Sequence, residues 1–120
     1  MSKPNEAPAQ LPHIRCEQDA FTHAGQRAVV EGIYQQEDVR MMQVNPPVLH
    51  LGHAVLVLDD GCRVFLYPPA SPAALRDAAE IRRCENRRTR ASGVILPRIP
   101  QDDAVQQAPC LVDVESIEPV

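Results

Sequence analysis

The sequence predicts a single, mainly β domain with five strands and one α-helix. Residues 53–67 read HAVLVLDDGCRVFLY, in which two runs of strand-forming residues flank Asp-Asp-Gly, the pattern of a β-hairpin. Residues 71–86 have apolar side chains at helical spacing, and two further strand-like runs follow them. With 120 residues, the chain is long enough for one domain with a core of modest size.

The first strand is expected at residues 26–34, which are rich in Val, Ile and Tyr. Gly32 interrupts this run, and a glycine inside a strand often marks a bulge or a sharp bend. Residues 38–44 are expected to continue the strand beyond the bend, until Asn45-Pro46-Pro47 ends regular structure. The hairpin at 53–67 then supplies the second and third strands.

The helix is expected to begin at Ser71-Pro72, because serine accepts bonds from free backbone amides and proline suits the first helical turn. It should end near Glu85-Asn86. Its core face would hold Ala74, Leu75, Ala78 and Ile81, and its solvent face Arg76, Glu80, Arg83 and Arg87. The fourth and fifth strands are expected at 89–99 and 109–117.

Residues 1–12 contain three prolines and are expected to form a disordered tail. Residues 13–25 would be an N-terminal extension, with a short strand or turn packed on the domain formed by residues 26–120. The N-terminus has no hydrophobic signal region, and no apolar run approaches the roughly 20 residues of a membrane helix. A cytoplasmic location without membrane contact is therefore expected.

The predicted order β-β-β-α-β-β resembles that of the OB-fold, a five-stranded Greek-key barrel. OB-folds place one α-helix between strands 3 and 4, and Gly32 stands where their long first strand bends sharply. The resemblance covers residues 26–117 and rests on the order of elements. The alternative is another small barrel or a two-layer α+β sheet. The chain is also similar to small uncharacterised bacterial proteins with such a hairpin and a Pro-Pro stop, which implies no activity.

Arg63, Phe65 and Tyr67 alternate along one predicted strand and would face the same side. The OB-fold resemblance implies that this face binds single-stranded nucleic acid, with aromatic rings stacking on bases. In the alternative interpretation, Phe65 belongs to the core and Tyr67 lies at the rim with its hydroxyl in water. The net charge of −4 and the scarcity of aromatic residues favour the alternative.

Residues 71–90 hold six arginines against three acidic residues, a local charge of +3. Arginine forks match the oxygens of phosphates and carboxylates. A solvated helix end, with arginines near the negative end of the helix dipole and paired with Glu80 and Glu85, is the alternative. If the arginines bind a partner, an acidic protein surface is favoured over nucleic acid. The basic cluster consists of Arg82, Arg83, Arg87, Arg88 and Arg90.

His50 and His53 form an H-x-x-H pair and are weak candidates for metal ligands. Residues three apart in an extended segment point to opposite faces, so the pair favours no metal site. The four cysteines contain no C-x-x-C pair and are expected to be reduced and mostly buried. Because the sequence also lacks nucleophile and phosphate-binding motifs, neither a cofactor nor an enzymatic activity is expected.

Together these patterns predict a non-enzymatic binding module whose partner is an unidentified protein, in the manner of an adaptor, an immunity-like protein or an assembly subunit. The alternative is an OB-fold protein that binds single-stranded nucleic acid. The candidate binding residues are Arg63, Phe65, Tyr67, Arg83, Arg87, Arg88 and Arg90.

Overall fold

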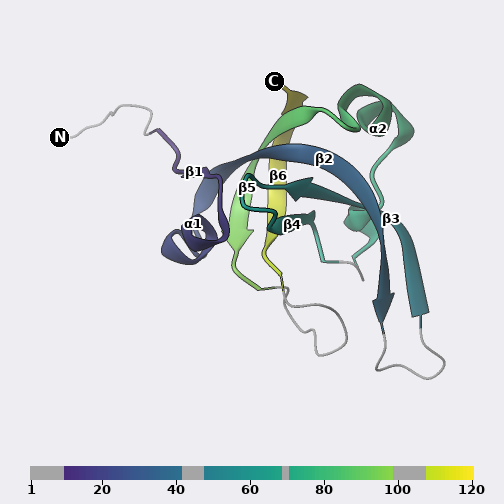
Figure 1. Ribbon diagram of the computed structural model, residues 1–120, viewed down its shortest axis with the longest axis horizontal. Coiled ribbons are helices and arrows are strands. Elements are labelled where there is room, and N and C mark those ends of the chain that lie inside the picture. Colours follow the sequence, from purple (N-terminus) through teal and green to yellow (C-terminus); the bar gives the residue numbers. More distant parts are fainter. Residues whose placement is uncertain (1–9, 42–47, 69–70, 99–107) are drawn as a thin grey trace.

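The computed structural model describes residues 10–41, 48–68, 71–98 and 108–120, with the side chains of all of these except 38–41 and 48–51. Its central feature is a closed barrel of five strands (Figure 1). The predicted mainly β barrel is thus confirmed, and closure excludes an open two-layer sheet. The strands are β2 (Arg27–Met41), β3 (Val48–Val57), β4 (Arg63–Leu66), β5 (Arg88–Leu96) and β6 (Cys110–Pro119).

The barrel has the strand order β2-β3-β4-β6-β5 and closes where β5 pairs with β2. Neighbouring barrel strands are antiparallel except β4 and β6, which run parallel. A short strand β1 (His13–Ile14) adds a parallel pairing to β2. The sheet is therefore mixed, and it contains one strand beyond the five of the barrel.

The long strand β2 is shared between two neighbours. Its residues 27–33 pair with β5 and its residues 33–41 pair with β3, so the partner changes beside Gly32. A Cβ atom at position 32 would lie 2.5 Å from the carbonyl oxygen of Val57, so only glycine fits this close approach. The sequence predicts a bulge or a sharp bend at Gly32; the bulge lies instead between Glu37 and Val39, and at Gly32 the strand changes partner.

The predicted hairpin is confirmed as β3 and β4. Leu58 N donates to Cys62 O at 2.8 Å, and Gly61 takes the left-handed φ of +85° that the turn requires. Asp60 accepts bonds from Cys62 N at 3.0 Å and from Glu17 N at 2.9 Å. The second bond joins the turn to helix α1 (Glu17–Thr22), which the sequence analysis missed.

The single helix predicted from Ser71 is wrong. Ser71 does cap a turn, but this is a 3-10 turn at Pro72–Ala74, and the α-helix α2 (Ala78–Cys84) begins separately after Asp77. Leu75 between them has an extended backbone, with φ −90° and ψ 106°. Consequently Leu75 is 64% exposed instead of facing the core.

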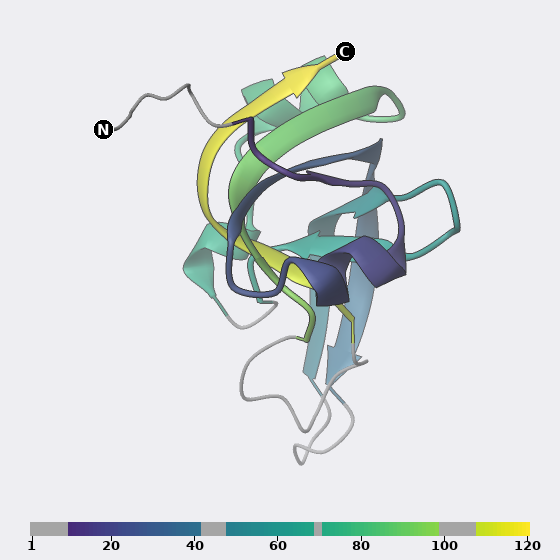
Figure 2. The same cartoon turned by 90° about the vertical axis from the view of Figure 1, so that its left-hand side faces the viewer.

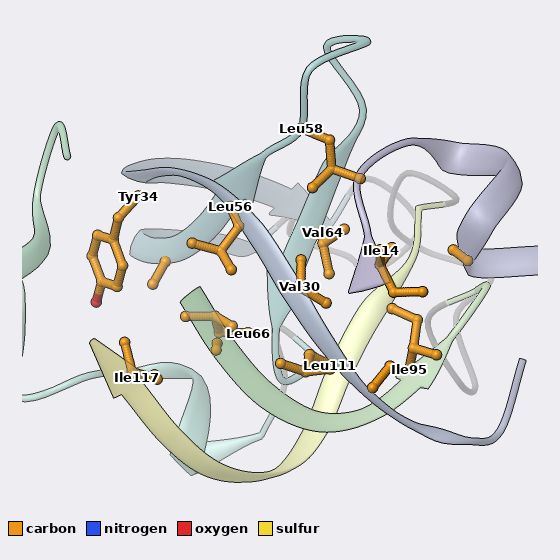
Figure 3. Close-up of a cluster of buried hydrophobic side chains, with 14 of the residues drawn as sticks. Ile14, Val30, Tyr34, Leu56, Leu58, Val64, Leu66, Ile95, Leu111 and Ile117 are labelled. Carbon is orange, nitrogen blue, oxygen red and sulfur yellow. The ribbon is translucent and has the colours of Figure 1, made fainter. Parts of the chain in front are cut away.

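The barrel interior is aliphatic, with one tyrosine at its edge (Figure 3). Tyr34 donates its hydroxyl proton to Glu80 of α2 at 2.8 Å, and Arg76 binds the same carboxylate at 2.8 and 2.9 Å. Burial, together with this bond, raises the pKa of Tyr34 far above its usual value. Glu80, predicted on the solvent face, is thus a buried part of the contact between α2 and the barrel.

Several predictions of the sequence analysis extend beyond the described residues. The tail at 1–12 overlaps the description only at 10–12, and Asn45-Pro46-Pro47 lies outside it. The predicted continuation of the first strand, 38–44, is described up to Met41, and there it is part of β2. The strands predicted at 89–99 and 109–117 are confirmed as β5 and β6, with bounds shifted by one to three residues.

Candidate binding surface

Two of the predicted arginines lie on the outer face of β5. Ala91 and Thr89 are buried, so alternation places Arg88 and Arg90 outside the barrel. Both side chains converge on Glu31 of β2, which is opposite Arg90 in the register. Arg88 Nε donates to Glu31 Oε2 at 2.6 Å, and Arg90 Nη2 donates to Glu31 Oε1 at 3.0 Å. Arg15 Nη2 lies 3.9 Å from the same carboxylate.

The Glu31 carboxylate is held in its ionised form. Its side chain is only 7% exposed, and burial alone would raise its pKa. The hydrogen bond from Arg88 outweighs this effect and, with the bond from Arg90, lowers the pKa of Glu31. At neutral pH Glu31 is therefore a fixed negative charge that orients two guanidinium groups.

The two guanidinium groups differ in which of their N–H donors have an acceptor among the described residues. Arg88 also binds Asp59 Oδ1 through Nη1 and Nη2, both at 3.3 Å, which joins β5 to the hairpin turn. Arg90 uses Nε and Nη2 for Glu31, and its Nη1 has no bond within the described part of the chain. Arg90 is half exposed, so this free edge can accept a further anion.

Three more arginines lie on α2 and on the turn between α2 and β5. Arg82, Arg83 and Arg87 are exposed, and Arg83 Nη2 donates to Ile117 O of β6 at 3.0 Å. Ile117 pairs with Ala91, the neighbour of Arg90, which places the end of α2 close to the start of β5 (Figure 1). We call the region formed by Arg82, Arg83, Arg87, Arg88 and Arg90 the arginine surface.

The stripe predicted from Arg63, Phe65 and Tyr67 does not form an open stacking face. Val64 and Leu66 point into the barrel, so Phe65 lies on the outer side. There it is 2% exposed and packs against Val55 and Cys110 in a second apolar cluster. Its ring is therefore not available for stacking on a base, in agreement with the core interpretation.

The flanking residues of that stripe have separate partners. Arg63 forms an ion pair with Glu37 of β2. Tyr67 follows β4 with a φ of 72°, and its hydroxyl accepts a bond from Val114 N at 3.0 Å. The Arg76 guanidinium lies 5.6 Å from the centre of the Tyr67 ring. The Tyr67 hydroxyl therefore has a partner within the protein, whereas the alternative interpretation gave it only water.

The histidine pair contributes no metal site that the structure describes. His53 is buried on β3 opposite Glu37, whereas the side chain of His50 lies outside the described residues. Among the described residues, no group of three or more His, Cys, Asp or Glu side chains is arranged to hold a metal.

All four cysteines are free thiols, as expected. Cys84 and Cys110 are buried, and Cys16 and Cys62 are partly buried. Burial raises the pKa of Cys62 to about 11 and that of Cys110 to about 12. These two thiols are protonated at neutral pH, which makes them poor nucleophiles and poor metal ligands.

Sequence analysis missed a groove on the outer face of β2, β5 and β6, with a volume of about 320 Å³. Val29, Ser92 and Ser116 form one cross-strand row in it, and Arg90 and Glu118 belong to the next row. The hydroxyls of Ser92 and Ser116 lie 2.8 Å apart. Alternation within β5 and β6 predicts which residues point outward, but only the register between strands brings these rows together.

Comparison with known proteins identified no relative of this chain. Neither a protein-family model, nor a curated protein, nor a solved structure matches this chain. The similarity to small bacterial proteins is therefore unsupported. Separately, no helix in the described segments has the length and apolar character that crossing a membrane requires.

Proposed function

We propose that this protein is a non-enzymatic binding module whose partner is another protein with an acidic surface. The arginine surface is the observation that supports this proposal. Four of its five side chains are exposed, and Arg88 is partly exposed, in a chain whose net charge is −4. Clustered cations on an otherwise acidic protein steer association toward partners that present carboxylates.

We assign the barrel to the OB type within this proposal. The strand order β2-β3-β4-β6-β5, the parallel pairing of β4 with β6, and the position of α2 between β4 and β5 in the chain all support the assignment. OB-type barrels serve several kinds of ligand, so the choice of partner rests on the surface and not on the fold.

A protein partner fits the surface better than single-stranded nucleic acid does. Nucleic-acid binding of this kind relies on exposed aromatic rings, and Phe65 is buried. Glu31 and Asp59 lie among the arginines and interrupt the row of cations that a phosphate backbone, with a charge on every nucleotide, requires. Arginine edges bind carboxylates in the plane of the guanidinium, which suits the side chains of Asp and Glu.

Three of the buried or partly buried ionisable groups act in packing. The raised pKa values of Cys62 and Cys110 keep these thiols protonated. The hydroxyl of Tyr34 donates to Glu80 and joins α2 to the barrel. In the proposed function these three groups stabilise the barrel and its contact with α2.

The proposal is tested by fluorescence anisotropy of a fluorescein-labelled hexaglutamate peptide, titrated with the full chain at increasing salt. We expect binding that weakens as salt rises, because exposed charges are screened. Arg87→Glu should weaken binding several-fold, because the partner loses one cation and meets a repelling charge.

Arg98→Glu is the matched control, since it makes the same charge change just beyond the other end of β5, where Arg98 is also exposed. Equal losses in the two variants, or no binding of the peptide at any salt, would contradict the proposal. Binding of an oligothymidylate in place of the peptide would support the nucleic-acid alternative.

A further inference from the structure

We infer that the groove across β2, β5 and β6 is the place where an extended acidic segment of the partner protein binds, with one carboxylate on Arg90. This inference rests on the proposed function and names the contact within it. The groove is formed by Val29, Arg90, Ser92, Ser116, Glu118 and Pro119 among others.

The guanidinium of Arg90 has one edge occupied and one edge free. Its Nε and Nη2 donate to the same Glu31 oxygen at 3.3 and 3.0 Å. The opposite edge, formed by Nη1 and the second proton of Nη2, has no acceptor among the described residues. A planar guanidinium binds two carboxylates on two edges, so Glu31 fixes the side chain and leaves a complete two-donor edge for a ligand.

The second row of the groove suits the backbone of a peptide. Ser92 and Ser116 share one hydrogen bond between their hydroxyls, so one proton and several lone pairs remain for a ligand. Val29 and Pro119 supply apolar surface beside them. An extended segment offers both N–H and C=O groups to such a pair, whereas an isolated small anion would leave the hydroxyls unused.

Glu118 limits the charge that the groove accepts. It is exposed and lies opposite Arg90 in the register, on the side away from Glu31. With a carboxylate on each side of Arg90, a single incoming carboxylate is favoured and a row of closely spaced phosphates is repelled. Neighbouring acidic residues of the partner would then meet Arg82 and Arg83 of α2 and Arg87 of the turn that follows it.

The test is an NMR titration of the full chain, labelled with ¹⁵N, with the hexaglutamate peptide. We expect the amides of Ser92 and Ser116 and the Nε–H of Arg90 to shift. Arg90→Lys should weaken binding about tenfold and abolish these shifts, because lysine keeps the charge but loses the two-donor edge. Arg98→Lys, the same change at an exposed arginine outside both the groove and the arginine surface, should leave the affinity unchanged.

A second variant keeps the test informative if Arg90→Lys disturbs its pairing with Glu31. The double change Ser92→Ala, Ser116→Ala leaves Arg90 intact and should weaken binding several-fold. Peptide binding with shifts confined to α2 and the turn that follows it would overturn the groove and leave the proposed function standing. Absence of any peptide binding would overturn the proposed function itself, and shifts of Ser92 and Ser116 caused by oligothymidylate would overturn the peptide as the ligand.

Discussion

At the scale of single residues, Glu31 decides how the arginine surface is presented. Its carboxylate is nearly buried and bonds both Arg88 and Arg90, which are themselves partly exposed. Removing the charge would leave two guanidinium groups facing each other without the anion between them. The same carboxylate therefore contributes to stability and to the geometry of the surface.

Glu31→Gln should lower the free energy of unfolding at neutral pH by about 1–2 kcal/mol, less than for a fully buried pair because the arginines reach solvent. Because the pKa of Glu31 is lowered on folding, its contribution is present above the ordinary value of 4.5 and is lost as the pH falls further. Urea unfolding of both proteins at several pH values measures this contribution to the free energy of unfolding.

The difference in unfolding free energy between wild type and Glu31→Gln should shrink below pH 4.5. Glu37→Gln, which removes a carboxylate from the exposed pair with Arg63, serves as a control and should cost less than Glu31→Gln. An unchanged difference across this pH range would show that the Glu31 charge is not stabilising.

At the scale of elements, local patterns predicted the hairpin and the last two strands, because the strand-forming and turn residues that indicate them lie within each segment. The helix was predicted too long because the helical spacing of apolar residues does not show that the backbone becomes extended at Leu75, between the 3-10 turn and α2. The same local pattern places Glu80 on the solvent face, because its partner Tyr34 is 46 residues away in the sequence. Helix α1 has only six residues and no side-chain cap, so its signal is weak.

The close approach of β2 to β3 at Gly32 can be tested by substitution. Gly32→Ala would place a methyl group 2.5 Å from the backbone oxygen of Val57, and we expect a loss of stability of about 3 kcal/mol, the upper end for overpacking. Gly25→Ala meets no atom within 4 Å but has a φ of +80°, so it should cost only about 1–2 kcal/mol. Urea unfolding of both variants gives the comparison, and a greater loss for Gly25→Ala would contradict this account.

At the scale of the whole molecule, closure of the barrel brings distant segments onto one outer face (Figure 2). Residues near 30, 90 and 117 come from β2, β5 and β6, and together they form the groove and its arginine. The sequence showed the arginines as a cluster because Arg82 to Arg90 are close along the chain. It showed neither Glu31 among them nor the serine pair, because both depend on the register between strands.

The central claim is that this surface selects carboxylates over phosphates. The most direct measurement is competition at equal salt between the hexaglutamate peptide and an oligothymidylate of the same formal charge, each displacing the labelled peptide from the full chain. We predict that the unlabelled peptide displaces it at concentrations at least about tenfold lower than the oligothymidylate, because a carboxylate completes the Arg90 edge while neighbouring phosphates meet Glu31 and Glu118. Equal displacement, or stronger displacement by the oligothymidylate, would contradict the claim.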